Sequence, residues 1–129
     1  MDRAGRSPLH YAALTNDAAE VTRLIAEGEA PDSSDSQGFT PLHLASQEHA
    51  LAAATALLNL DAMVDPANSF GNTPLFVAVF SSRGRPEMID LLRSRGANPL
   101  HPNDAGQTPV GLARLIGNYD VAQYFEDLR

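Results

Sequence analysis

The strongest constraint on this chain is a seven-residue stretch, Phe39-Thr40-Pro41-Leu42-His43-Leu44-Ala45, because close variants of it occur three more times. The variants begin at Ser7, Thr73 and Thr108, and the prolines follow one another at intervals of 33, 33 and 35 residues. Self-similarity at a fixed period of this length is typical of stacked repeats, in which each unit packs on its neighbours. The period predicts four repeats, with boundaries at about residues 2–34, 35–67, 68–102 and 103–129.

Each copy of the stretch has the chemistry of a helix start. A Ser or Thr hydroxyl can accept from a free amide of the first turn, and Pro fits the first helical position because the amide it lacks would have no partner there. A glycine stands two residues before each Ser or Thr, where it permits the positive φ of a tight turn. We therefore predict helices that begin after Ser7, Thr40, Thr73 and Thr108, each preceded by a turn at Gly5, Gly38, Gly71 or Gly106.

A second helix is predicted in each repeat. In the first repeat, Val21, Leu24 and Ile25 have the spacing of one buried helix face, and Gly28 suits the end of that helix. The third repeat has two extra residues, which fall in its longer helix–helix turn, residues 81–86. Insertions in repeat proteins map to loops, often on a functional face, so this turn is a second candidate contact region.

The units resemble ankyrin repeats, whose pattern is Gly-x-Thr-Pro-Leu-His-x-Ala, then Gly at the helix turn, then Val-x-x-Leu-Leu-x-x-Gly-Ala. Residues 38–45 match the whole first part, and residues 5–12 match it with Ser in place of Thr. Residues 89–97 match the second part at its Ile, Leu, Gly and Ala positions. The resemblance implies an all-α ankyrin-repeat solenoid, a single domain over residues 1–129, with four helix-turn-helix units and β-hairpin fingers between them.

Composition narrows the classes of partner. The net charge of -7 argues against nucleic acid or an anionic membrane as the main partner and favours a basic protein. There is no cysteine for a disulfide framework, and no apolar run approaches the roughly 20 residues of a membrane span. We expect a cytoplasmic protein. The nine basic residues are all arginine, which hints at a high-GC, bacterial genome.

No cluster of residues predicts catalysis. His10 and His43 occupy equivalent positions in successive repeats, where the resemblance implies that histidine braces the helix start. Phe76 and Gly111 replace it in the last two units, so that polar network must be missing or altered there. The other two histidines lie in predicted turns without metal-ligand spacing, and the glycines form no phosphate-cradling loop. We predict no enzymatic activity, no metal and no cofactor.

The informative residues are those that the repeat does not need. The resemblance implies that groove side chains come from the fingers and from the exposed ends of the first helices. Phe39, Phe70 and Phe80 fall in this set, and an apolar patch rimmed by polar groups usually marks a partner site. Alternatively, some of them fold onto a neighbouring finger or helix. The predicted partner-binding residues are Arg6, Leu14, Gln37, Phe39, Gln47, Glu48, Phe70, Asn72, Phe80, Arg83, Arg85, Gln107 and Leu115.

Three functional hypotheses follow. The first is a non-catalytic module, monomeric on its own, that binds a partner protein through its concave groove. The second is an antitoxin-like or immunity inhibitor, in which an acidic chain covers the active site of a basic toxin such as a nuclease. The third is a structural role through self-association, which the acidic C-terminal helix disfavours.

Overall fold

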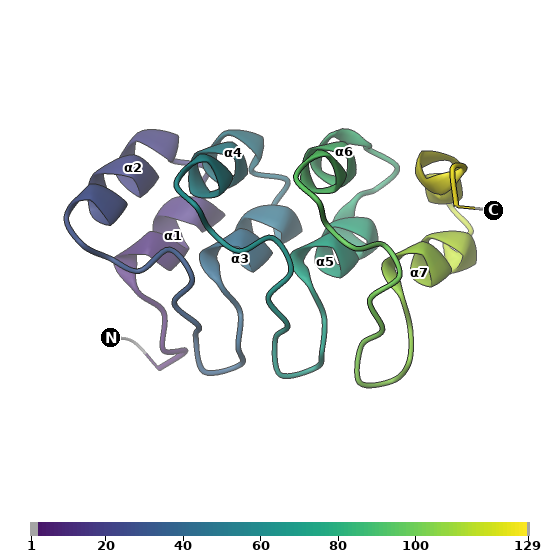
Figure 1. Ribbon diagram of the computed structural model, residues 1–129, viewed down its shortest axis with the longest axis horizontal. Coiled ribbons are helices and arrows are strands. Elements are labelled where there is room, and N and C mark those ends of the chain that lie inside the picture. Colours follow the sequence, from purple (N-terminus) through teal and green to yellow (C-terminus); the bar gives the residue numbers. More distant parts are fainter. Residues whose placement is uncertain (1–2, 129) are drawn as a thin grey trace.

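The computed structural model describes residues 3–128 and shows a row of paired helices (Figure 1). The first helices of the pairs lie side by side in one row and the second helices in another, with the two termini at opposite ends. The last pair ends in a 3-10 helix. The elements are α1 (Pro8–Leu14), α2 (Ala18–Ala26), α3 (Pro41–Gln47), α4 (Leu51–Asn59), α5 (Pro74–Ser81), α6 (Glu87–Ser94), α7 (Pro109–Leu115) and η1 (Val121–Phe125).

The four predicted helix starts are confirmed, since Pro occupies the first position of α1, α3, α5 and α7. The Thr108 hydroxyl accepts from the backbone N–H of Gly111 at 3.0 Å, and Thr40 and Thr73 cap their helices in the same way. The Ser7 hydroxyl lies 2.9 Å from Nδ1 of His10, and the Thr40 hydroxyl lies 3.0 Å from Nδ1 of His43 in the same way. The local chemistry of each Ser/Thr-Pro step therefore decides where the first helix of every unit begins.

The core is one continuous cluster of buried aliphatic side chains that runs from Leu9 to Phe125. Leu9, Leu42 and Leu75 occupy the same position in successive units and are fully buried. Small residues alternate with them: Ala45 is also fully buried, and it lets neighbouring first helices approach one another. Each unit thus buries its apolar face against the next one, as stacked repeats require.

The fingers differ from the predicted β-hairpins, because residues 3–128 contain no strand. The second, third and fourth fingers are instead each built around one Asp or Asn side chain. Oδ1 of Asp35 accepts from the backbone N–H groups of Gln37 and Phe39, each at 2.9 Å, and Asn68 and Asn103 organise their fingers in the same way.

Within residues 3–128, one backbone hydrogen bond joins the second finger to the third, and one joins the third to the fourth. The N–H of Ser69 donates to the carbonyl of Gln37 at 2.9 Å, and the N–H of Asp104 donates to that of Phe70 at 3.0 Å. A strand ladder needs a succession of such bonds, so the fingers stay as turns laid against one another.

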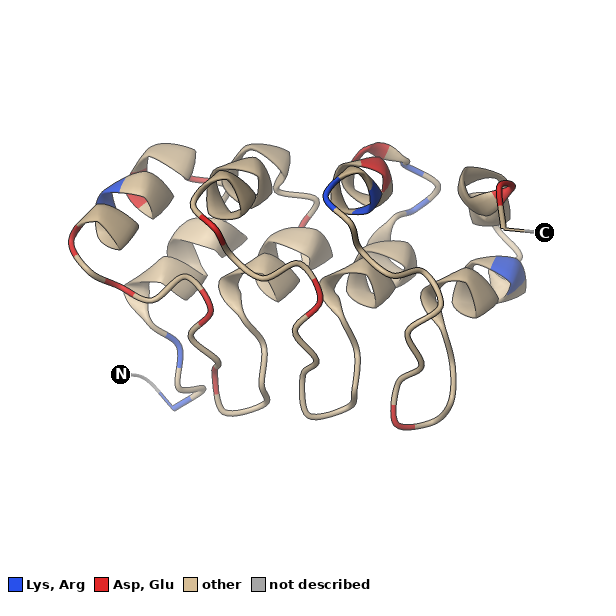
Figure 2. Ribbon diagram, in the orientation of Figure 1, with Lys and Arg blue, Asp and Glu red and all other residues tan. Residues whose placement is uncertain are grey.

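Charged residues avoid the row of first helices (Figure 2). Helices α1, α3 and α5 contain no charged residue, and α7 contains only Arg114. Most of the Asp, Glu and Arg lie in the loops and in α2 and α6, whereas α4 has none. No helix in residues 3–128 is long and apolar enough to cross a membrane.

Candidate functional site

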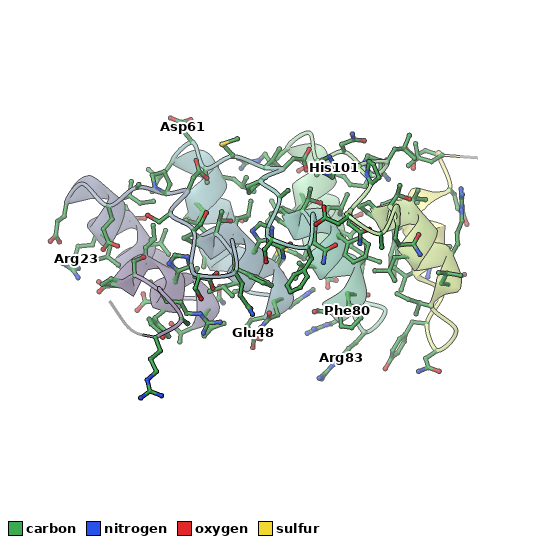
Figure 3. All side chains as sticks on the ribbon, turned by 90° about the horizontal axis from the view of Figure 1, so that it is seen from below. Arg23, Glu48, Asp61, Phe80, Arg83 and His101 are labelled. Atoms are coloured by element: carbon green, nitrogen blue, oxygen red, sulfur yellow. The ribbon has the colours of Figure 1, made fainter. Side chains whose placement is uncertain are left out.

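Three adjoining hollows form a groove between the fingers and the C-terminal ends of the first helices, and Phe80 borders all three. Phe80 lies in the last turn of α5 and is 74% exposed, so its ring forms a ridge between the hollows. Figure 3 shows Glu48, Phe80 and Arg83 on one side of the stack, opposite Asp61 and His101. We call the residues that line the three hollows the groove.

The first hollow, of about 380 Å³, is mainly apolar. The second and third fingers contribute to it from one side, and helices α3 and α5 contribute from the other. Its lining residues are Phe39, Gln47, Phe70, Asn72, Phe76, Val77, Phe80 and Ser81. Phe70 is 52% exposed at the finger edge, whereas Phe39 is half-buried with its ring 5.5 Å from that of His43.

The second hollow, of about 510 Å³, is polar and basic. It lies between the C-terminal end of α3 and the turn that joins α5 to α6. Its lining residues are Gln47, Glu48, Phe80, Ser81, Arg83 and Arg85. The turn from Ser82 to Pro86 carries the two-residue insertion of the third unit, so the insertion opens onto the groove.

The third hollow, of about 230 Å³, faces the last unit. Its lining residues are Phe80, Ser82, Arg83, Leu112, Ile116, Asn118 and Tyr119. The groove therefore combines two mainly apolar hollows with one polar, basic hollow, and Phe80 borders all of them.

The predicted site residues divide into two sets. Eight of them line the groove: Phe39, Gln47, Glu48, Phe70, Asn72, Phe80, Arg83 and Arg85. The other five, Arg6, Leu14, Gln37, Gln107 and Leu115, line none of the three hollows.

Three of these five residues, Arg6, Leu14 and Leu115, belong to the first and last units. Nε of Arg6 lies 3.6 Å from Oδ2 of Asp35, and its guanidinium stands over the Tyr11 ring, so it contributes to packing within the first two units. Leu14 is half-buried at the end of α1, and Leu115 is exposed beyond the last hollow.

Sequence reasoning did not name four aromatic and aliphatic lining residues, which are Phe76, Val77, Leu112 and Tyr119. Phe76 had a visible signal, since an aromatic ring stands where the repeat otherwise has histidine. Val77 and Tyr119 had none. Tyr119 comes from the segment between α7 and η1 and reaches the groove only because the last unit packs beside the insertion.

The repeat histidines are structural, as predicted. Nδ1 of His43 accepts from the backbone N–H of Thr40 at 3.1 Å, which places the ring proton on Nε2, and Nε2 donates to the carbonyl of Asn72 at 2.8 Å. Burial lowers the pKa of His43 and keeps the ring neutral. His10 makes the same pair of contacts, within its own unit and to the carbonyl of Phe39.

Between the third and fourth units, Phe76 replaces the histidine, and its ring cannot make this hydrogen bond to the next finger. There Nδ2 of Asn103 donates to Oδ1 of Asn72 at 2.8 Å, so a finger-to-finger amide bond joins the third and fourth units. The predicted alteration of the polar network is confirmed at this junction. In residues 3–128, no group of three or more His, Cys, Asp or Glu side chains is placed to hold a metal ion.

Comparison with known families explains the repeated architecture. A family model described as ankyrin repeats (3 copies) matches residues 1–68, and another described as ankyrin repeats (many copies) matches residues 79–126. A search of curated proteins finds no match to this chain. The two matched regions contain α1 to α4 and α6 to η1, and the helix pairs, turns and capped starts described above recur in both. This chain belongs to the ankyrin-repeat family.

Proposed function

We propose that this protein is a non-catalytic module that holds a partner protein in the groove. Ankyrin repeats are generally protein–protein interaction modules and are typically non-catalytic. The observation that carries the proposal is Phe80, a large aromatic side chain that is 74% exposed at the meeting point of three hollows. Binding energy at interfaces concentrates in such aromatic residues when a partner covers them at the centre of a patch.

Phe70 and Phe39 are the other proposed anchors. Phe70 is exposed across the apolar hollow from Phe80, so a partner side chain that enters this hollow would contact both rings. Phe39 already packs edge-on against His43, and it therefore serves the stack as well as the groove. We expect Phe80 and Phe70 to dominate affinity and Phe39 to contribute less.

The inhibitor of a basic toxin stays a prediction from net charge. Among the described residues that line the hollows, Glu48 is the one acidic side chain, and it shares its hollow with two arginines. The local charge of the groove therefore gives no support to a basic partner at this surface, although the net charge of -7 would still attract one at long range.

The test compares Phe70→Ala/Phe80→Ala with a control, Met63→Ala/Leu100→Ala, that removes two equally exposed apolar side chains outside the hollows. Proteins retained from the source cell's lysate are identified by mass spectrometry, and the affinity of the retained partner is measured by calorimetry. We expect the control to retain the partner and the groove variant to lose it, with each Phe→Ala change costing about 1–3 kcal/mol. Equal retention by both variants would move the site away from the groove.

A further inference from the structure

We propose that Arg83 and Arg85 bind carboxylate groups of the partner, beside an apolar partner side chain that packs on Phe80. The partner segment would then be acidic, with an apolar residue next to its Asp or Glu. This inference rests on the proposed function of the groove and names the chemistry of its occupant.

The first observation is that these two cations lack a counter-charge. In residues 3–128, no carboxylate lies within ion-pair distance of either guanidinium. Arg6, Arg23 and Arg93 do contact carboxylates, and both terminal nitrogens of Arg93 donate to Asp127. Arg95 and Arg114 donate instead to the neutral oxygens of Asn59 and Leu128. A chain with a net charge of -7 has ample carboxylates, yet none is placed against this pair.

The second observation is that the turn presenting the arginines is held in place by the last unit. The hydroxyl of Tyr124 donates to the carbonyl of Gly84 at 2.5 Å, and a Cβ on Gly84 would lie 2.8 Å from Cδ1 of Tyr119. Nε of Arg85 donates to the carbonyl of Ser82 at 3.0 Å, which leaves its terminal nitrogens for a partner. A site ordered before binding loses less conformational entropy when the partner arrives.

The third observation is the arrangement of the hollows. The arginines share a hollow with Phe80, and the apolar hollow begins on the other side of the same ring. Guanidinium groups bind carboxylates through paired N–H donors, and exposed aromatic rings bind apolar side chains. Glu48 lines the far side of the basic hollow and would repel a carboxylate there, directing it toward the arginines.

The same arginine chemistry would suit phosphate, but a polyanion such as nucleic acid must also approach a protein of net charge -7. One or two discrete carboxylates on a protein segment avoid that repulsion. The surface therefore fits a short acidic and apolar segment of a protein.

The experiment selects a phage-displayed library of random 12-residue peptides on the intact protein and sequences the retained peptides. The best peptide is then measured by fluorescence anisotropy against Arg83→Gln/Arg85→Gln and against Arg23→Gln/Arg95→Gln, a control that removes the same net charge outside the groove. We expect retained peptides to carry Asp or Glu beside an apolar residue. We also expect the groove variant to bind about tenfold or more weakly, and the control to bind within about twofold of the native protein.

Two further variants keep the result interpretable. Arg85→Lys keeps the positive charge but loses the Nε contact to Ser82. Because we assign binding to a partner carboxylate, this variant should retain more affinity than Arg85→Gln. Circular dichroism checks that each variant is folded. Raised salt should weaken binding to the native protein more than to the double Arg→Gln variant, because it screens the ion pairs.

The outcomes separate this inference from the proposed function. Apolar peptides that bind Arg83→Gln/Arg85→Gln as well as the native protein, and lose affinity with Phe80→Ala, would overturn the inference and keep the groove. Retained peptides rich in Lys or Arg would overturn it in favour of a basic partner. Insensitivity to both the arginine and the Phe80 changes would contradict the groove itself. Arginine-dependent binding of a single-stranded oligonucleotide in place of any acidic peptide would assign the pair to phosphate.

Discussion

At the scale of single residues, His43 couples the second unit to the third, as His10 couples the first unit to the second. His43 is fully buried, its Nδ1 accepts from the backbone of its own unit and its Nε2 donates to the third finger. The third unit places Phe76 at the same position, so the chain itself contains a natural comparison between a polar and an apolar occupant. Both occupy the second position after the Pro at the helix start, and only the histidine can titrate.

The first prediction concerns His43→Phe. The change leaves the N–H of Thr40 without its acceptor, and we expect it to cost about 1–3 kcal/mol of unfolding free energy at pH 7. The pKa of His43 is lowered in the folded state by burial, so as the pH falls below about 6.5 the unfolded chain binds a proton before the folded one does. Native stability should therefore decrease from pH 7 to pH 5, by at most about 1.4 kcal/mol per pH unit from this group.

The check is urea unfolding of both proteins between pH 5 and pH 8. The variant should show a shallower decrease at low pH, because it lacks the His43 imidazole, and every other titratable group is present in both proteins. Parallel curves would mean that burial of His43 does not set the pH dependence in this window.

At the scale of elements, the fingers depend on close approach between consecutive turns. Gly71 has φ of +78°, and a Cβ there would lie 2.6 Å from the backbone nitrogen of Asp104 in the next finger. Gly106 has nearly the same φ, +80°, but nothing lies within 4 Å of the position its Cβ would take. The two glycines therefore separate backbone strain from finger packing.

The second prediction compares Gly71→Ala with Gly106→Ala. Both changes place a Cβ in the left-handed region, which costs roughly 1–2 kcal/mol. Only Gly71→Ala also pushes against backbone atoms, so we expect its loss of unfolding free energy to be about twice that of Gly106→Ala or more. Urea denaturation of the two variants and the native protein measures the difference. Equal losses would show that the fingers can separate without cost.

At the scale of the whole molecule, each unit depends on its neighbours to bury its apolar face. The continuous core supports our proposal that residues 1–129 form one domain, since each unit completes the apolar face of the next. In the 129-residue chain, the unit of α1 and α2 packs on one neighbouring unit, and η1 is a five-residue 3-10 helix beside α7. Short 3-10 segments have poorer hydrogen-bond geometry than α-helices.

The third prediction is the pattern of amide hydrogen exchange along the 129-residue chain. We expect the slowest exchange in α3, α4, α5 and α6, and faster exchange in residues 1–30, because local opening costs least where a unit has one neighbour. We also expect fast amide exchange in η1, because it is a short 3-10 helix. Exchange measured by mass spectrometry on overlapping peptides resolves these regions, and uniform protection from end to end would contradict the gradient.

The sequence alone determined the number of units, the start of each first helix, the turns and the buried positions. These follow from signals within a few residues, such as Thr40-Pro41 or the helical spacing of Val21 and Leu24, because capping, turn geometry and helix periodicity are local. The structural role of His43 was also predictable, since its position repeats with the period. The family resemblance suggested strands in the fingers, but a side-chain-centred turn such as that of Asp35 leaves too few backbone groups for a ladder.

Only the tertiary structure decided which exposed residues form a site. Phe39 and Phe80 look alike in sequence, yet one ring packs against His43 and the other stays uncovered. Arg83 and Arg85 meet Phe80 in one hollow because tyrosines of the last unit hold their turn there. The physical reason is that exposure and charge pairing depend on atoms from other units, and no local signal encodes which distant side chains will cover, support or neutralise a given one.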